Sequence, residues 1–192
     1  MTLMPCFGPH QAPAEGMLIG QILAGYGELE VAMCACIIAV EGQLDLPIRK
    51  LFNERNAEKR IKESKKALIQ KYTKAGLHIE LEEALRDMEW CRKIRNQYAH
   101  CQWYWTSQEG LCFVNLEELA KQPTPIVSII DNRHSIDVKL LAAQEEYFNY
   151  VKESFTHLEF AYRGWNQAHS TARWSTLVFP KPSKKTRPPS HN

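Results

Sequence analysis

Apolar residues recur every three to four positions along most of the chain, which is the spacing of one face of an α-helix. The pattern predicts helices over residues 15–40, 47–52, 56–74, 77–99 and 136–168. Gly42 and Gly76 directly follow two of these patterns, as glycine does at many helix ends. The sequence therefore predicts a mainly helical protein.

The side chains expected to face inward are the apolar members of each pattern. In the first three helices they are Ile22, Tyr26, Leu29, Met33, Ile37 and Val40, then Ile48, Leu51 and Phe52, then Ile61, Leu68 and Tyr72. In the last two they are Leu81, Ala84, Leu85, Met88, Cys91, Tyr98 and Ala99, then Leu141, Phe148, Val151, Phe155, Leu158, Tyr162 and Trp165.

After the fourth helix the chain becomes rich in aromatic and β-branched residues. Residues 101–105 and 111–114 flank the turn-like stretch 107–110, which predicts a β-hairpin. Residues 126–130 are interpreted as a third strand and residues 131–134 as a turn. The expected fold is all-α, a helical bundle with a small β-hairpin inserted after the fourth helix.

The chain is interpreted as an irregular segment over 1–14, one helical domain over 15–172, and a basic, Pro- and Lys-rich disordered tail over 173–192. The first fifteen residues contain no Lys or Arg, so no signal peptide is predicted. Glu28 and Glu30 interrupt the apolar stretch of the first helix, which favours a buried helix over a membrane span. We therefore expect a cytoplasmic protein with no membrane partner.

Charge is balanced over the whole chain but not along it. The 192 residues carry a formal net charge of +2, so net charge gives no argument for nucleic-acid binding. Residues 49–74, however, contain ten Lys or Arg against three Glu, and the tail contains five bases and no acid. Such segments attract polyanions, but they are more often a solvated helix face and a solubilising tail.

The cysteines and histidines predict no metal site. None of the six cysteines forms a Cys-x-x-Cys pair, and the histidines outside the fourth helix are scattered. We expect all six thiols to be reduced and most of them to be small buried side chains. No cofactor is predicted, because zinc sites are usually built from paired ligand doublets.

The end of the fourth helix carries the residues with the most suggestive chemistry. Arg95 lies on the apolar stripe, where a charge is costly unless it is paired or the face is not closed over within one chain. Beside it, Arg92, Asn96 and His100 are four residues apart and are expected to be neighbours on the helix surface. Asn96 is expected to hold His100 in one orientation, and no carboxylate belongs to the cluster itself.

These groups suit phosphate chemistry. Guanidinium groups bind a phosphodiester with two hydrogen bonds and stabilise the negative charge that develops on it. A histidine that titrates near neutrality can take a proton from a ribose 2′-hydroxyl or give one to a leaving oxygen. RNA supplies its own nucleophile in that hydroxyl, so such a reaction needs no metal.

Arg95, Asn96 and His100, as Arg-polar-x-x-x-His at the end of a long helix, resemble the signature of the HEPN superfamily. Its members are small helical domains, and many are metal-independent ribonucleases of toxins or of defence against phage. The resemblance implies a HEPN-like helical bundle, RNA as substrate, a homodimer in which two motifs share one cleft, and an antitoxin or regulatory protein as a possible partner. The Leu29–Glu30 pair is similar to one found in the first helix of many relatives.

The resemblance implies catalytic roles for Arg95, Asn96 and His100, and an orienting role for Glu30 as a partner of Arg95 or Arg92. We assign Arg92, Tyr98 and Trp103 as substrate-binding candidates. Trp103 and Trp105 are expected to share one face of their strand and Tyr104 the other, for base stacking or simply for packing. Some HEPN toxins continue His-x-Tyr, whereas this chain continues His100-Cys101-Gln102, which puts regulation by modification of that tyrosine in doubt.

Several alternatives remain open at the level of sequence. Arg95 and Glu30 can form a purely structural ion pair, and His100 can be a helix C-terminal cation favoured by the helix dipole. The chain can then be a catalytically inactive HEPN-like module that binds a nucleotide, RNA or a protein, or a helical interaction subunit unrelated to that family. A second, looser match, from Arg163 to His169, has Gly after the Arg and is interpreted as a chance match.

Overall fold

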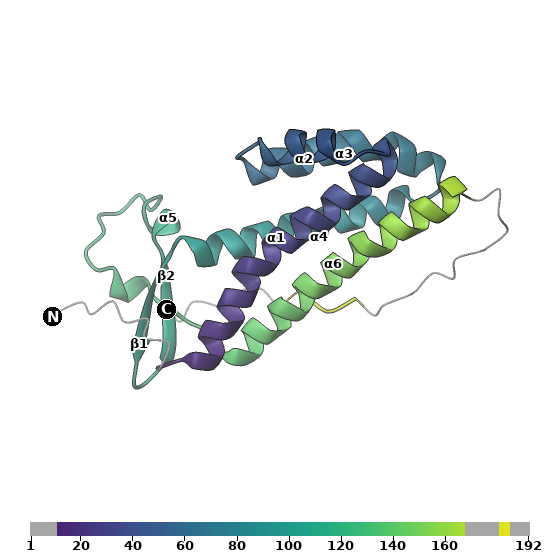
Figure 1. Cartoon of the computed structure of the whole chain (residues 1–192). Coiled ribbons are helices and arrows are strands. Elements are labelled where there is room, and N and C mark those ends of the chain that lie inside the picture. Colours follow the sequence, from purple (N-terminus) through teal and green to yellow (C-terminus); the bar gives the residue numbers. More distant parts are fainter. Residues whose placement is uncertain (1–10, 168–180, 185–192) are drawn as a thin grey trace. The chain divides into compact units, whose positions relative to one another are not determined.

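The computed structural model describes residues 11–167 and 181–184 and is mainly helical in them, as predicted. The helices are α1 (Pro13–Glu41), α2 (Asp45–Phe52), α3 (Ala57–Lys74), α4 (His78–Ala99), α5 (Leu116–Leu119) and α6 (Val138–Gln167) (Figure 1). The strands are β1 (Cys101–Thr106), β2 (Gly110–Asn115) and β3 (His134–Ser135), and a 3-10 helix, η1, spans Ile130–Asn132. The expected irregular segment and tail lie mostly outside the described residues, and α1 already begins at Pro13.

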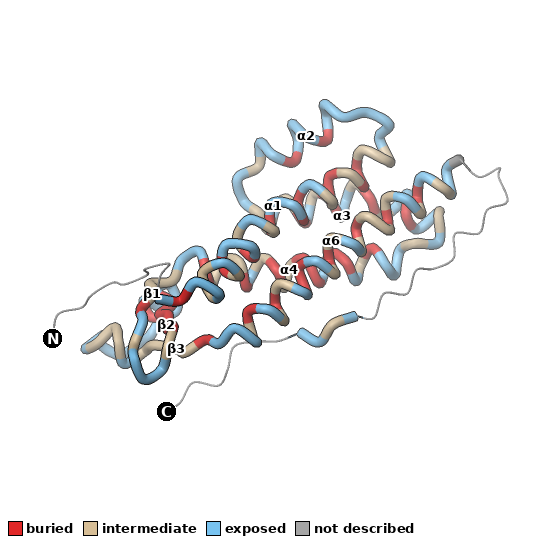
Figure 2. Tube along the Cα trace, turned by 60° about the horizontal axis from the view of Figure 1, so that its bottom comes forward, coloured by how far each residue is buried: buried red, intermediate tan, exposed pale blue. Residues whose placement is uncertain are grey.

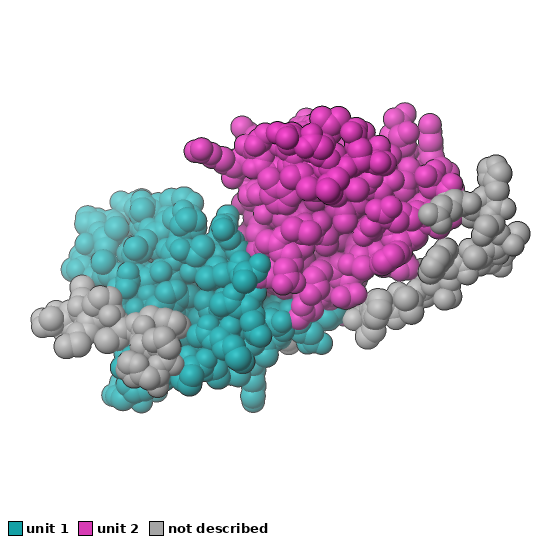
Figure 3. Space-filling view, viewed as in Figure 1, with its two compact units in different colours: residues 1–24, 94–146, 182–192 teal, residues 25–93, 147–181 magenta. Residues whose placement is uncertain are grey.

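The chain forms two compact units, each assembled from separate stretches of sequence (Figure 3). Unit 1 consists of residues 1–24, 94–146 and 182–192, and unit 2 of residues 25–93 and 147–181. Helices α1, α4 and α6 each contribute residues to both units. The single domain expected over residues 15–172 stays a prediction.

Unit 2 is a bundle of helices with the core that the helical periodicity predicted. Its fully buried side chains include Leu29 and Met33 of α1, Leu68 and Tyr72 of α3, Leu81 and Met88 of α4, and Phe155 of α6. The Tyr72 ring stacks on Tyr162 with 4.9 Å between ring centroids. Figure 2 shows these buried positions as repeated segments along each helix, because residues three or four apart face the same side.

Local signals fix the ends of these helices. The side chain of Asn56 accepts a hydrogen bond from the backbone N–H of Lys59 at 3.1 Å and caps the start of α3. Gly42 and Gly76, with φ of +71° and +75°, follow the ends of α1 and α3 as predicted. Glycine adopts this left-handed conformation without the steric cost that a Cβ brings.

The inward-facing prediction is wrong at two places in unit 2. In α2, Ile48 and Phe52 are each 40% exposed, and only Pro47 and Leu51 are buried. In α6, Trp165 is 45% exposed although the earlier members of its stripe are buried. Periodicity identifies the apolar face of a helix, but the width and length of the stripe that is covered depend on the neighbouring elements.

In unit 1 the predicted hairpin is confirmed. β1 and β2 pair antiparallel, with Trp103 opposite Phe113 and Tyr104 opposite Cys112. Tyr104 is buried in an apolar cluster with Cys112, Val114 and Leu119, whereas Trp103 belongs to the opposite face of the strand. The sheet is therefore packed around its central strand, β2, whose residues from Leu111 to Asn115 are all buried.

The third strand was predicted in the wrong place. Residues 126–129 form no regular element, and the strand that completes the sheet is β3, paired with β2 at Phe113 opposite His134. Ile126 and Val127 are 51% and 95% exposed. β-Branched composition favours a strand only where a partner strand is available to pair with it, and the composition does not identify that partner.

Helix α1 is the one helix in the described residues that is long and apolar enough to cross a membrane. In its most apolar window 44% of the residues are buried within the protein. The core helix of a soluble protein passes the same test. The burial of Ile22, Tyr26, Leu29 and Met33 agrees with the predicted core helix.

The described cysteines are free, and four of the five are buried. The Cys36 thiol donates a hydrogen bond to the carbonyl oxygen of Phe155 at 3.3 Å. Burial raises the pKa of Cys36 to about 12 and that of Cys112 to about 11, so both remain protonated thiols near neutrality.

Candidate functional site

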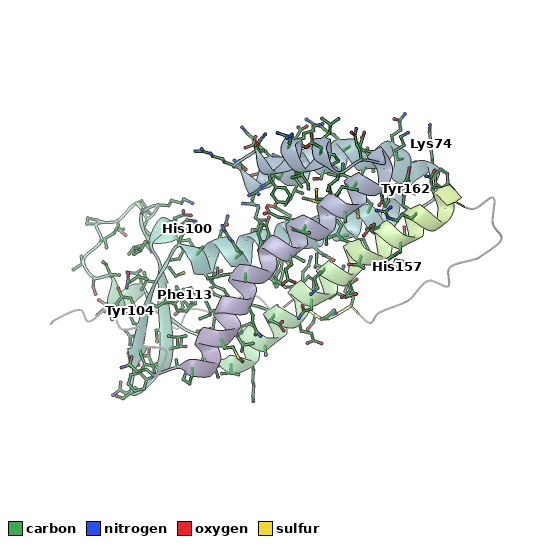
Figure 4. All side chains as sticks on the ribbon, viewed as in Figure 1. Lys74, His100, Tyr104, Phe113, His157 and Tyr162 are labelled. Carbon is green, nitrogen blue, oxygen red and sulfur yellow. The ribbon has the colours of Figure 1, made fainter. Side chains whose placement is uncertain are left out.

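The predicted motif lies at the C-terminal end of α4, in unit 1. The helical pattern continues one residue past the end of α4, because the His100 N–H donates to the carbonyl oxygen of Asn96 at 3.1 Å. The chain then enters β1 directly, so His100 stands at the junction of helix and hairpin (Figure 4). The His100 side chain is 51% exposed and is therefore accessible to a ligand.

Arg95 and Asn96 contact each other through their side chains. Nη1 of Arg95 donates a hydrogen bond to Oδ1 of Asn96 at 3.0 Å. Arg95 is half-buried rather than enclosed, so the predicted cost of a fully buried charge does not arise. The expected Asn96–His100 pairing is replaced by this contact, because the amide oxygen of Asn96 positions the guanidinium group of Arg95.

The imidazole of His100 faces a carboxylate that the sequence analysis missed. Nδ1 of His100 lies 3.8 Å from Oε1 of Glu117, the second residue of α5. Cys101 pairs with Asn115 across the hairpin, so the residues just outside this pair, His100 and the start of α5, lie close together. Asn115 holds that start by accepting hydrogen bonds from the N–H groups of Glu117 and Glu118.

A signal for this contact was present in the sequence. The predicted hairpin implied that the residue before the first strand lies beside the residues after the second strand. Asn115 followed by Leu116-Glu117-Glu118 is also typical of a capped helix start, which the sequence analysis did not use. No carboxylate was expected within the cluster of Arg92, Arg95, Asn96 and His100, whereas the structure places Glu117 next to His100.

Tyr98, which was assigned to substrate binding, is buried, and its role in substrate binding stays a prediction. Tyr98 is 2% exposed, and its hydroxyl donates a hydrogen bond to Oε1 of the buried Gln144. Its ring contacts Trp103 and Phe113 at centroid distances of 5.7 and 5.9 Å. Tyr98 lies on the buried face of α4 and joins this helix to the hairpin and to α6.

Trp103 has a packing role. Its ring lies 5.5 Å from Phe113, and Phe113 in turn lies 5.6 Å from the ring of His134 in β3. Trp103 remains partly exposed, and Trp105 on the same face of the strand is 40% exposed. The packing alternative accounts for the contacts of Trp103, and its contact with substrate stays a prediction.

Glu30 and Arg92 belong to unit 2 and have partners there. Glu30 is 6% exposed, and its Oε2 lies 3.0 Å from Nη1 of Arg60. Arg92 donates two hydrogen bonds to the carboxylate of Glu89, at 2.8 and 2.6 Å. Glu30 thus forms a buried pair with Arg60 of α3, which the sequence analysis did not expect, and its role in orienting Arg95 or Arg92 stays a prediction.

The buried Glu30–Arg60 pair affects its neighbours in unit 2. Burial and the negative charge of Glu30 raise the pKa of Tyr26 well above its usual range. The hydrogen bonds from Arg92 to Glu89 likewise raise the pKa of that guanidinium. The charged groups of this network lie next to groups of opposite charge, as buried charges usually do.

The basic segment is less free than its composition suggested. Of its ten bases, five form ion pairs with carboxylates: Arg49 with Asp45, Arg60 with Glu30, Lys62 with Glu58, Lys65 with Glu82 and Lys66 with Glu63. Surface ion pairs reduce the positive charge that a polyanion meets. The solvated-face alternative therefore accounts for much of this segment.

The remaining features do not add to the motif site. Within residues 11–167 and 181–184, no three His, Cys, Asp or Glu side chains are grouped as metal ligands. A cavity of about 250 Å³ in unit 2, lined by Leu46, Pro47, Leu51, Arg60 and Ser64 among others, contains none of the predicted site residues. Arg163 of the looser motif pairs with Glu159 at 2.8 Å, and His169 lies outside the described residues.

Comparisons with known proteins leave the family open: no protein-family model, no curated protein and no solved structure matches the chain.

Proposed function

We propose that the protein is a metal-independent endoribonuclease of the HEPN type that uses the 2′-hydroxyl of RNA as nucleophile. The observation that carries the proposal is the accessible imidazole of His100, which follows the linked Arg95–Asn96 pair and faces the carboxylate of Glu117. The end of α4 thus carries a cation that can bind an anion, Arg95, and a group that can transfer a proton, His100. The carboxylate of Glu117 lies beside His100. A cation for the phosphate and a group for proton transfer are the kinds of group that a metal-free cleavage of a phosphodiester uses.

The proposed roles follow from the chemistry of each side chain. Arg95 binds the scissile phosphate and stabilises the charge that develops on its oxygens, and Asn96 holds the guanidinium through the 3.0 Å hydrogen bond. His100 takes the proton of the 2′-hydroxyl or gives one to the leaving 5′ oxygen. Glu117 is a positioning residue, because its carboxylate lies 3.8 Å from Nδ1 of His100 and attracts the imidazole when the ring carries a positive charge.

The proposed reaction is an internal transfer. The 2′ oxygen loses its proton and bonds to the adjacent phosphorus, the bond from phosphorus to the 5′ oxygen breaks, and that oxygen takes up a proton. The products are a 2′,3′-cyclic phosphate and a 5′-hydroxyl end. One histidine performs one of the two proton transfers, so a homodimer in which two copies of His100 face one cleft would supply both a base and an acid.

The direct test incubates purified protein with mixed RNA in EDTA and identifies the new RNA ends. We expect cleavage by wild type with cyclic phosphate ends, and a loss of about 100-fold or more in His100→Ala, the usual contribution of a general acid or base. His78→Ala is the matched control, because His78 is an exposed histidine at the other end of α4. Full activity of His100→Ala, or cleavage that depends on added metal, would reject the assignment.

The alternative is a catalytically inactive HEPN-like module that binds RNA, a nucleotide or a protein through the same surface. The observation that favours it is the exposure of His100, because catalytic groups usually lie in a concave site that excludes water. For this alternative we expect RNA affinity that falls in Arg95→Ala and stays unchanged in His100→Ala, with no cleavage by either protein.

The leading proposal also includes a cytoplasmic location, a toxin or phage-defence role and an antitoxin partner. These three are tested by locating the protein in its own cell and by purifying it from that cell together with whatever binds it.

A further inference from the structure

Asp87 is a buried carboxylate that the motif does not use. It lies on α4 within unit 2 and is only 2% exposed. Aspartate is almost never fully buried unless it is paired, because an isolated charge loses its hydration there. Asp87 therefore requires a partner that is strong enough to keep its charge in the interior.

A cationic partner of Asp87 comes from a residue far along the chain. Nζ of Lys181, a residue that follows α6 in the sequence, lies 2.6 Å from Oδ2 of Asp87. The same ammonium group lies 5.8 Å from the ring centroid of Tyr150 on α6. Both contacts are attractive for a cation, one with a carboxylate and one with the face of an aromatic ring.

The surroundings of Asp87 strengthen this attraction. Tyr147 packs against Trp90 and Tyr150, with centroid distances of 4.7 and 5.8 Å, and forms an aromatic wall beside the carboxylate. Burial and the neighbouring Asp87 raise the pKa of Tyr147. An apolar wall lowers the local dielectric constant, so an ion pair beside it is stronger than one in water.

We propose that Asp87, Tyr147 and Tyr150 form an ammonium-binding site on α4 and α6 of unit 2, and that this site captures Lys181 and holds this residue against the two helices. The ligand class is a primary ammonium group on a flexible alkyl chain. Such a group can pair with the carboxylate of Asp87 and lie over the ring of Tyr150 at the same time. This proposal is independent of the proposed ribonuclease activity.

The pair differs from the ordinary ion pairs of the same unit. The side chains of Lys62 and Glu58 are 66% and 46% exposed, and those of Lys66 and Glu63 are 73% and 43% exposed, whereas those of Lys181 and Asp87 are 39% and 3% exposed. Exposed pairs of adjacent helical turns contribute little, because water and salt screen them. The Lys181 pair also joins two residues that are distant in sequence, whereas the Lys62 and Lys66 pairs each lie within one helix.

Residue-resolved acetylation of the full chain tests the site. A limiting amount of an amine-reactive acetylating reagent is added to native protein, and the rate at each lysine is read by mass spectrometry. An ion-paired ammonium reacts slowly because the reagent needs the free amine, so we expect Lys181 to react about tenfold more slowly than the exposed Lys71 and Lys121. Equal rates at Lys181 and these two lysines in wild type would overturn the proposal.

Asp87→Asn provides the second arm, because it keeps the shape of the side chain and removes its charge. We expect the Lys181 rate to rise to that of Lys71 while the rates at Lys62 and Lys66 stay unchanged. A slow Lys181 in a folded Asp87→Asn protein would show that another group protects it and would also overturn the proposal.

A third arm does not depend on the folding of Asp87→Asn. Lys181→Met leaves Asp87 buried without its cation, and we expect its midpoint of thermal unfolding to fall by about 5 °C or more. Lys181→Arg restores a cation and is expected to recover most of that loss. Equal midpoints for wild type, Lys181→Met and Lys181→Arg would contradict the capture of Lys181.

Discussion

Glu30 of α1 and Arg60 of α3 form a buried ion pair, with 3.0 Å between Oε2 and Nη1 and side chains that are 8% and 17% exposed. This contact gives Glu30 a structural place within unit 2, in a network that includes Tyr26. The carboxylate that faces His100 is instead Glu117, which no helical pattern placed near the motif. Glu30 is therefore tested by its effect on stability, and Glu117 by its effect on the proposed activity.

Glu30→Gln is expected to lower the free energy of unfolding by about 3 kcal/mol, because removing one partner of a buried pair leaves the other charge uncompensated. Chemical denaturation followed by circular dichroism measures this loss. Glu63→Gln is the matched control, since the Glu63 side chain is 43% exposed and paired with Lys66, and its effect should lie within error. If both substitutions cost the same, the Glu30–Arg60 contact does not contribute as a buried pair.

Glu117→Gln is expected to reduce the proposed RNA cleavage only about two- to fivefold, because a surface ion pair is worth roughly 0.2–1 kcal/mol. The reduction should appear in kcat and not in KM, since Glu117 acts on His100 and not on the substrate. Glu117→Asp should recover part of the loss, and Glu118→Gln, its exposed neighbour, should have no effect. A change confined to KM would instead place Glu117 in RNA binding.

Tyr98→Phe separates the buried position found here from the predicted role in substrate binding. The substitution removes the hydroxyl that donates to Gln144 and should cost about 1–2 kcal/mol of stability. RNA affinity of the folded variant should equal that of wild type, measured by titration with a labelled RNA at fixed salt. A loss of affinity at unchanged stability would support Tyr98 as a substrate contact.

Gly76→Ala is expected to destabilise the protein by about 1–2 kcal/mol, because φ at this position is +75° and a Cβ is strained there. No atom lies within 4 Å of the added Cβ, so the cost comes from the backbone alone. Gly20→Ala, inside α1 and equally open, should stabilise by about 0.5–1 kcal/mol. Unfolding midpoints measure the two changes in stability, which should have opposite signs. A loss of stability in both variants would show that the backbone conformation is not what separates the two glycines.

Much of the fold could be predicted because its signals are local. Helical spacing located the five main helices, Gly42 and Gly76 located two of their ends, and the aromatic run after His100 located the hairpin. The third strand was misplaced because the partner of β2 is chosen by packing in unit 1 and not by the composition of residues 126–130. The short helix α5 was missed although Asn115 is a typical cap for it.

The sequence alone determined which residue types stand at the end of α4, and therefore which chemistry to look for there. Tertiary structure decided how they are used: Asn96 holds Arg95, Glu117 faces His100, Tyr98 is buried, and Glu30 pairs with Arg60. It also decided that the buried Asp87 meets Lys181, a residue far along the chain. Periodicity fixes the face of a helix on which a side chain lies. A contact between distant segments depends instead on how the chain folds back on itself. A buried charge is stable only where this folding brings a partner of opposite charge, which offsets the cost of burial.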